Sequence, residues 1–268
     1  MTTLDERTIG FIGLGLMGKP MARNLHAAGA TMFIHNRSQA VVEELSGEGM
    51  RAAATPAEIA AAVGEGGTVI LSLPDTATVE KIVQGTPGDN NGIVSGIKDG
   101  TLVIDMSTTK VTATRGFAKA VTSAGGVYMD APVSGGQEGA QNGQLTIMVG
   151  GSDEDFAQGE PALQAYAKAV THMGPVGSGQ LTKMINQICC ACSIQALAEG
   201  MNFAVKSGLD PHQVLDVISK GAAQSWQMEN RGKTMVDGKF DFGFACDWMR
   251  KDLGICLDEA RVHGAQIP

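Results

Sequence analysis

Residues 8–25 read TIGFIGLGLMGKPMARNL, a short apolar run that leads through a glycine-rich turn into a helical pattern. The run at 8–13 predicts a buried strand, and the apolar spacing over 17–28 predicts a helix. Between them, the glycines at 13, 15 and 18 have the spacing G-x-G-x-x-G. That spacing alone is a weak signal, but a preceding strand and a following helix are the context in which such a turn binds a dinucleotide.

Each glycine has a separate predicted task in this turn. Gly13 permits the tight turn, Gly15 lets the backbone approach a pyrophosphate, and Gly18 allows the helix to pack closely on the strand. The N–H groups and the partial positive charge of the helix N-terminus would hold the phosphates. A purely structural turn is the alternative, which the surrounding pattern disfavours. The predicted cofactor contacts here are Gly13, Leu14, Gly15, Leu16, Met17 and Gly18.

The residues after the second predicted strand discriminate between the two nicotinamide cofactors. An acidic residue at this point would bind the ribose 2′-hydroxyl of NAD. This chain instead has Asn36, Arg37 and Ser38. Arg37 offers a planar cationic fork and Ser38 a hydroxyl donor, which suit a 2′-phosphate. A solvated surface arginine is the alternative. The sequence therefore favours NADP as the cofactor and leaves NAD open.

Short apolar runs and helical patterns alternate over the first part of the chain. Strands are predicted at 31–35, 68–73, 101–106, 127–130 and 144–151, with helices at 39–45, 56–62, 76–83 and 110–124. This alternation predicts βαβ units and a mostly parallel sheet with both faces covered. The turn signal Asn142-Gly143 leaves the last strand free to be antiparallel. We therefore expect a Rossmann-type, doubly wound α/β domain.

The pattern changes after Gly174, beyond which no strand is predicted. A helix of about 40 Å is expected at 180–206. A second helix is expected to begin at Asp210-Pro211, and a third is expected to cover 244–263. The C-terminal part is thus expected to be all-α and joined by the long helix. The predicted division is a dinucleotide-binding domain at 1–176, an interdomain helix at 177–207 and a helical domain at 208–268, with further helix expected beyond the last residue.

The bulk composition narrows the classes of partner and compartment. The chain has 268 residues, a formal net charge of −8 and no basic run, which argues against nucleic acid and an anionic membrane as partners. The N-terminus lacks the pattern of a secretory signal. No uninterrupted apolar stretch is expected to be long enough to span a bilayer. A cytoplasmic protein is the expectation.

The cysteines and histidines do not predict a metal site. Cys189 and Cys192 form a C-x-x-C inside an apolar, helical run, so that a redox or metal role stays open. Small buried hydrophobic side chains in a reducing compartment are the favoured interpretation of the cysteines. The histidines lack the spacing of zinc ligands. We expect no bound metal.

Four motifs together give the chain a family resemblance. They are FIGLGLMGKPMARNL (11–25), DAPVSGGQEGAQNG (130–143), GSGQLTKMINQ (177–187) and DWMRKDL (247–253). With them the chain resembles, over essentially its whole length, the β-hydroxyacid dehydrogenase family, which includes 3-hydroxyisobutyrate dehydrogenases and tartronate semialdehyde reductases. The resemblance implies an oxidoreductase that transfers a hydride between NADP(H) and a small 3-hydroxy acid or semialdehyde.

The resemblance also implies roles for individual residues. Lys183 would be the catalytic lysine. The predicted substrate-binding residues are Ser134, Gly135, Gly136, Asn186 and Gln187, and further predicted cofactor contacts are Leu73, Pro74, Thr108 and Lys251. Many family members have a second Asn where this chain has Gln187, which leaves the identity of the substrate open.

The chemistry expected of these residues agrees with the resemblance. Lys183 stands in an otherwise apolar helical segment, with Asn186 and Gln187 on its face. A partly desolvated lysine that faces a cationic nicotinamide is expected to have a lowered pKa, which suits an acid in reduction and a base in oxidation. The small residues at 134–136 would expose successive N–H groups to a carboxylate. For Lys251, an ion pair with Asp247 is the plainer interpretation.

Two other functions stay open. The chain could be an imine reductase on the same scaffold, although Lys183 beside Asn186 favours hydroxyacid chemistry. It could also be a dinucleotide-binding module without turnover, which the presence of Lys183 and Ser134 disfavours. The expected partners are a small carboxylate-bearing substrate and further copies of the chain, because the helical half has apolar faces; a homodimer and a homotetramer are both open.

Overall fold

The computed structural model describes residues 3–241 and 245–267. The strands in these ranges are β1 Thr8–Ile12, β2 Thr31–His35, β3 Arg51–Ala52, β4 Thr68–Leu71, β5 Leu102–Asp105, β6 Val127–Asp130, β7 Val133–Ser134, β8 Leu145–Gly150 and β9 Ala167–Gly174. The helices are α1 Gly18–Ala27, α2 Gln39–Gly47, α3 Pro56–Val63, α4 Thr76–Gln84, α5 Ile93–Gly96, α6 Val111–Ser123, α7 Gly136–Gln141, α8 Asp153–Gln164, α9 Ser178–Lys206, α10 Pro211–Ile218, α11 Trp226–Val236 and α12 Cys246–His263.

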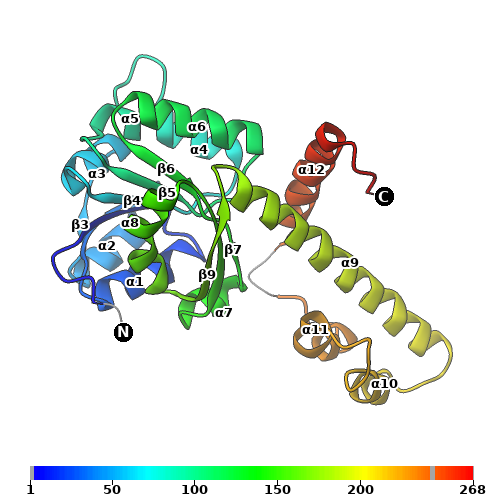
Figure 1. Cartoon of the computed structure of the whole chain (residues 1–268). Coiled ribbons are helices and arrows are strands. Elements are labelled where there is room, and N and C mark those ends of the chain that lie inside the picture. Colours follow the sequence, from blue (N-terminus) through cyan, green and yellow to red (C-terminus); the bar gives the residue numbers. More distant parts are fainter. Residues whose placement is uncertain (1–2, 242–244, 268) are drawn as a thin grey trace. The chain divides into compact units, whose positions relative to one another are not determined.

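The strands form one sheet in the order β3-β2-β1-β4-β5-β6-β8-β7, with β9 paired to β8 (Figure 1). Neighbouring strands from β3 to β6 are parallel. Strand β8 is antiparallel to β6 and β7 and parallel to β9. The predicted Rossmann-type fold is confirmed, and the strand expected at 144–151 takes the antiparallel option against β6.

Alternating strand residues build a hydrophobic core on each face of the sheet. Phe11, for example, packs with helices α1, α2 and α8 on one face, whereas Ile12 packs with α3, α4 and α6 on the other. Because both faces are covered, the central strands are apolar at consecutive positions. This is the physical origin of the short continuous apolar runs that mark the strands in the sequence.

Local capping defines where several of the crossover helices begin. The Thr55 hydroxyl accepts a hydrogen bond from Glu58 N at 3.1 Å, and Pro56 occupies the first turn of α3. The Asp75 carboxylate accepts from Thr78 N at 2.8 Å and caps α4. Such caps satisfy N–H groups that have no partner within the helix. They fix the turns that follow the carboxyl ends of the strands.

Several elements differ from the sequence prediction. The strand at 144–151 is not the last one, because β9 follows it and pairs with β8. The sequence of β9, AKAVTHMG, is not continuously apolar, since alternate residues of this outer strand are exposed. Helices α8 and α11 are absent from the sequence prediction. Helix α8 contains Pro161, which interrupts the helical pattern of its sequence. The helix expected over 244–263 is present from Cys246; Phe244 lies outside the described residues.

The chain divides into two compact units. The first comprises residues 1–183 and 259–268 and contains the sheet, and the second comprises residues 184–258. The second unit has its own small core of Leu197, Met201, Leu215 and Met228. The boundaries expected after residues 176 and 207 stay predictions.

Helix α9 is long and apolar enough to cross a membrane by length and composition alone. The expectation that the chain has no such stretch is therefore wrong by this criterion. The signal is weak, because the core helix of a soluble protein passes the same test. Its cysteines also differ from expectation: Cys189 and Cys192 are exposed, as is Cys246 on α12, and only Cys256 among the five is buried.

Candidate active site

The carboxyl ends of four adjacent parallel strands meet at one edge of the sheet. Ile12 of β1 is in register with His35 of β2 and with Leu71 of β4, and Leu71 is in register with Asp105 of β5. Ligands of open α/β sheets bind outside this edge. The predicted cofactor residues that follow these strand ends are the turn at 13–18, Asn36, Arg37, Ser38, Leu73, Pro74 and Thr108.

The glycine turn after β1 is the predicted pyrophosphate site. Gly13 has φ +96°, and a side chain there would collide with the backbone oxygen of Ser72. A side chain at Gly18 would collide with the backbone oxygen of Gly13. A Cβ at Gly15, by contrast, would meet no atom within 4 Å. Packing within the chain therefore requires Gly13 and Gly18, whereas the open space at Gly15 agrees with the predicted phosphate site at the N-terminus of α1.

Asn36 connects the end of β2 to the glycine turn. Leu14 N donates to Asn36 Oδ1 at 3.0 Å, and the Asn36 amide donates to Ser38 O at 3.3 Å. This amide therefore holds the turn in place, and the predicted contact of Asn36 with the cofactor stays a prediction. Arg37 and Ser38 are exposed at the tip of β2. Their predicted contact with a 2′-phosphate stays a prediction, and this exposure keeps both side chains available for it.

A buried hydrogen-bond network lies beneath the loops that follow β4 and β5. Asp105 accepts from the Tyr128 hydroxyl at 2.9 Å and from Ser107 N at 2.9 Å. The Ser107 hydroxyl in turn accepts from Leu73 N at 2.9 Å. Sequence reasoning placed Leu73 in the cofactor cleft but missed Asp105 and Ser107, which fix its loop. The available signal was an acidic residue at the end of an otherwise apolar strand.

The burial of Asp105 makes the free energy of unfolding depend on pH. Burial raises the pKa of this carboxyl from 3.8 to about 6, against the opposing effect of its hydrogen bonds to Ser107 and Tyr128. Between these values the folded protein binds more protons than the unfolded chain, so this group lowers the free energy of unfolding as pH rises from about 4 to about 6. Above the folded-state pKa its effect is constant. The difference between the two pKa values corresponds to about 3 kcal/mol.

Replacing Asp105 with Asn is expected to remove the part of the pH-dependent decrease in the free energy of unfolding that this carboxyl causes. The free energy of unfolding of the variant, relative to the parent, should rise by up to about 3 kcal/mol between pH 4 and pH 6. Urea titrations of both proteins at several pH values measure the difference. Asp130 has a similar burial-raised pKa of about 6 and contributes a decline of its own, which the difference between the proteins cancels. A constant difference across this range would contradict the assignment to Asp105.

Lys183 lies in the second turn of α9, on the buried side of the helix. Only 7% of it is exposed, and Gln180 three residues earlier is fully buried. The Gln180 amide donates to Ser107 O at 2.8 Å and accepts from Thr109 N at 3.1 Å. The helix start is held by Asp130, which accepts from Gly177 N at 2.7 Å and from Gln180 N at 2.8 Å. The structure thus ties the segment that carries Lys183 to the ends of β5 and β6.

The predicted carboxylate-binding turn begins at Ser134, the last residue of β7, and ends at Gly136, the first residue of α7. Ser134 is half-buried, and Gly135 and Gly136 are exposed with φ of +133° and +62°. These positive values favour glycine, which has no Cβ to clash with the backbone. Helix α7, which begins at Gly136, packs against α1, where Asn24 Nδ2 donates to Ala140 O at 2.8 Å.

The remaining predicted residues belong to the second unit and form a hydrogen-bonded series there. Asn186 donates to the Gln187 amide oxygen at 2.8 Å, and Gln187 donates to Asp252 Oδ2 at 2.6 Å. Lys251 forms an ion pair with Asp252 at 3.0 Å, whereas Asp247 contacts Arg250 at 3.4 Å. Lys251 therefore pairs with the buried Asp252 and not with Asp247, the partner expected from the sequence. Sequence reasoning missed Asp252, although it directly follows Lys251.

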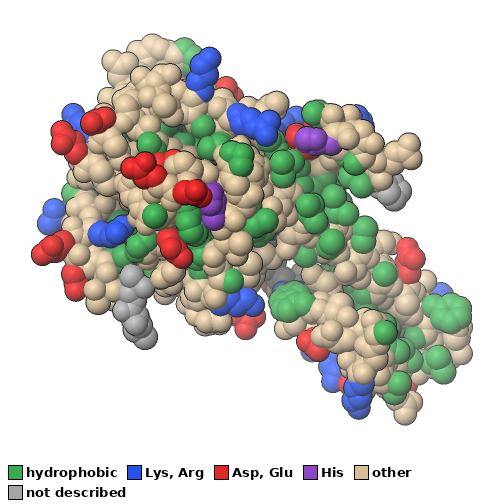
Figure 2. Space-filling model, in the orientation of Figure 1, with side chains coloured by type: hydrophobic (Ala, Val, Ile, Leu, Met, Phe, Trp, Pro, Cys, Tyr) green, Lys and Arg blue, Asp and Glu red, His purple; other side chains and the backbone are tan. Residues whose placement is uncertain are grey.

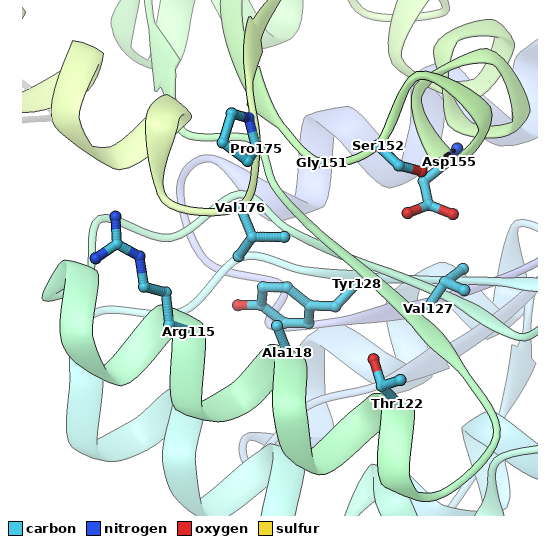
Figure 3. A pocket seen from close by; sticks show the side chains of 10 residues that line it. All are labelled: Arg115, Ala118, Thr122, Val127, Tyr128, Gly151, Ser152, Asp155, Pro175 and Val176. Carbon is cyan, nitrogen blue, oxygen red and sulfur yellow. Dashed lines mark hydrogen bonds between the residues drawn. The ribbon is translucent and has the colours of Figure 1, made fainter.

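A separate cavity of about 550 Å³ lies between α6, β6 and the turn that leads into α8. In Figure 3, Arg115 from α6 and Asp155 from α8 stand on opposite sides of it, with Tyr128 between them. Its lining contains none of the predicted site residues. The described ranges also hold no group of three or more His, Cys, Asp or Glu that could bind a metal ion.

Comparison with known proteins supplies the family. Residues 8–174 match the family described as the NAD binding domain of 6-phosphogluconate dehydrogenase, and residues 177–268 match the family described as NAD-binding of NADP-dependent 3-hydroxyisobutyrate dehydrogenase. The chain is 38% identical to 2-(hydroxymethyl)glutarate dehydrogenase of Eubacterium barkeri, over 97% of this chain and 84% of that protein. The chain belongs to the β-hydroxyacid dehydrogenase family.

Two further members of the family illustrate the match. This β-hydroxyacid dehydrogenase is 37% identical to 2-hydroxy-3-oxopropionate reductase of Escherichia coli, over 97% of its own length and 86% of the relative. The structure of Mycobacterium tuberculosis 3-hydroxyisobutyrate dehydrogenase with L-serine matches with a TM-score of 0.87 and 30% identity, over 98% of this chain and 89% of that one. The chain is accordingly an NAD(P)-dependent oxidoreductase, as the glycine turn predicts.

Proposed function

We propose that this dehydrogenase transfers a hydride between NADP(H) and a small 3-hydroxy acid or the corresponding semialdehyde. The observation that carries the proposal is the position of Lys183. It is almost fully buried and lies three residues after Gln180, whose side chain binds the loop after β5. That loop follows the same edge of the sheet as the glycine turn. Reduction of a carbonyl group needs a proton donor close to the bound cofactor, and the cofactor is expected at this edge of the sheet.

The proposed roles follow from the chemistry of each group. When bound, the nicotinamide cofactor supplies or accepts the hydride. Lys183 donates a proton to the substrate oxygen in reduction and removes it in oxidation. The Ser134 hydroxyl and the N–H groups of Gly135 and Gly136 hold the substrate by its carboxylate. The glycine turn and the N-terminus of α1 bind the pyrophosphate.

The function is tested by following NADPH absorbance with 2-hydroxy-3-oxopropionate and 2-methyl-3-oxopropionate as substrates. Both are small semialdehydes that carry a carboxylate. Turnover with either compound supports the proposal. Binding of NADPH without turnover of either would support the alternative of a dinucleotide-binding module. Reduction of a cyclic imine in preference to both would support the imine reductase alternative, which Lys183 beside Asn186 disfavours.

The carboxylate role of the turn at 134–136 gives a separate expected result. A methyl ester of either semialdehyde cannot accept charge-assisted hydrogen bonds, each of which contributes about 1.5–3 kcal/mol. We expect kcat/KM for the ester to be about ten- to more than a hundredfold lower than for the free acid. Steady-state kinetics with the acid and its ester measure the ratio. Equal kcat/KM values would remove the carboxylate from substrate recognition.

We further propose a cytoplasmic homo-oligomer, a dimer or a tetramer. Ile185 and Phe203 on α9 are 63% and 71% exposed, and other large apolar side chains are exposed in the second unit (Figure 2). Such patches favour contact with another protein surface, and a second copy of the chain is always available as that partner. Sedimentation equilibrium distinguishes a monomer, a dimer and a tetramer, and cell fractionation tests the compartment.

A further inference from the structure

The Gln180 side chain connects the helix of the proposed catalytic lysine to the loop of the cofactor cleft. Its amide donates to Ser107 O at 2.8 Å and accepts from Thr109 N at 3.1 Å. These two backbone groups flank Thr108, a predicted cofactor contact, on either side. Gln180 is fully buried and lies 71 and 73 residues from its partners. One amide therefore holds both peptide groups around Thr108.

The connection extends beyond this loop in two directions. The Ser107 hydroxyl accepts from Leu73 N at 2.9 Å, so the loop after β4 is part of the same network. The backbone N–H of Gln180 donates to Asp130 at 2.8 Å, which fixes the first turn of α9 to the end of β6. Gln180 is thus held at its backbone and at its side chain by different strand ends. Lys183, three residues later, lies on the same face of the helix.

We propose that Gln180 is a positioning residue, which sets the distance between the Lys183 ammonium group and the loops after β4 and β5. This inference rests on the proposed catalytic role of Lys183. Proton transfer requires a heavy-atom distance within hydrogen-bond reach, and a displacement of about 1 Å can lower the rate about a hundredfold. Within the described residues, the hydrogen bonds of Gln180 go to Ser107, Thr109 and Asp130 and not to the glycine turn, so cofactor phosphates are bound independently of it.

The first test replaces Gln180 with Met, which has a similar length but makes neither hydrogen bond. We expect kcat for the semialdehydes to fall about a hundredfold, whereas the dissociation constant of NADPH changes by less than about tenfold, because the phosphate contacts are intact. Thr182→Val is the matched control. In the parent, the Thr182 hydroxyl donates to Ser178 O, so that both partners belong to α9. The control removes this bond and no bond to the loop after β5. The control should keep kcat within about threefold of the parent, since it alters no contact with the loop.

The second test uses Gln180→Glu, whose charge depends on pH. A protonated Glu can accept from Thr109 N and donate to Ser107 O as the amide does, whereas its carboxylate would repel Ser107 O. The ratio of variant to parent kcat should therefore rise about tenfold or more from pH 8 to pH 5.5. The other titratable groups near this segment are present in both proteins, so the ratio removes their contribution; they are Asp105, Arg115, Tyr128, Asp130 and Lys183.

The outcomes separate this inference from the proposed function. If Lys183→Met is inactive while Gln180→Met and Gln180→Glu keep kcat within about threefold, the positioning role is overturned and the proposed function stands. If Lys183→Met keeps kcat within a few-fold of the parent, the proposed catalytic role of Lys183 fails, and the positioning role of Gln180 fails with it. A Gln180→Met protein with a lowered Tm but normal kcat at low temperature also overturns positioning. Should that variant not fold, a flat pH ratio for Gln180→Glu has the same meaning.

Discussion

Replacing Lys183 with Met is expected to lower kcat by a factor on the order of 10²–10⁴, which is the usual contribution of a general acid or base. Methionine fills the volume of the lysine stem, and the site on α9 is almost fully buried, so the fold should be retained. NADPH should bind within about threefold of the parent affinity, because the phosphate contacts are predicted to come from the turn at 13–18 and Arg37. Single-turnover kinetics and fluorescence titration measure the two quantities.

Two further variants sharpen the interpretation of Lys183. Lys183→Arg keeps the positive charge but should also fail, because a guanidinium group hardly gives up its proton. Lys206→Met is the matched control, since it removes a lysine from the last turn of the same helix. Its kcat should equal that of the parent. Activity of Lys183→Met within a few-fold of the parent would remove this lysine from the mechanism.

Replacing Arg37 with Asp is expected to reverse the cofactor preference. The parent should bind NADPH about ten- to more than a hundredfold more tightly than NADH, because a charge-assisted hydrogen bond to the 2′-phosphate contributes about 1.5–3 kcal/mol. The variant would repel the phosphate and accept hydrogen bonds from the ribose hydroxyls of NADH. Dissociation constants of both nucleotides on both proteins measure the change. Arg37 is exposed, so added salt should reduce the parent's preference.

Arg51→Asp is the matched control for this prediction. Arg51 belongs to β3, which pairs with β2, and its guanidinium lies 5.5 Å from the centre of the Phe33 ring. The control introduces the same charge change on the neighbouring strand, beyond the predicted ribose site. It should leave the ratio of the two dissociation constants unchanged. A parent that prefers NADH, or an Arg37→Asp variant with an unaltered ratio, would make Arg37 an ordinary surface residue.

The sequence by itself determined the alternation of strands and helices, and hence the parallel part of the sheet, together with the place of the cofactor turn. Central strands are apolar on both faces and glycine turns have fixed spacing, so both features leave local patterns. Lys183 also stood out, because a cation in an apolar helical run is unusual. The structure places Lys183 on the buried side of α9, on the same face as Gln180. The strands, the glycine turn and this lysine could be recognised from the sequence because each is defined by residues that are close together in the chain.

Only the tertiary structure decided which polar groups hold the site together. Asp130 contacts Gly177 across 47 residues, and Gln180 contacts Ser107 across 73. It also assigned Asn36 to the glycine turn and paired Lys251 with Asp252. A hydrogen bond between distant segments needs one donor and one acceptor at a particular distance, and it imposes no periodicity on either segment. For that reason the sequence showed where the strand ends and the lysine lie, whereas the amides and carboxylates that connect them became visible only once the chain was folded.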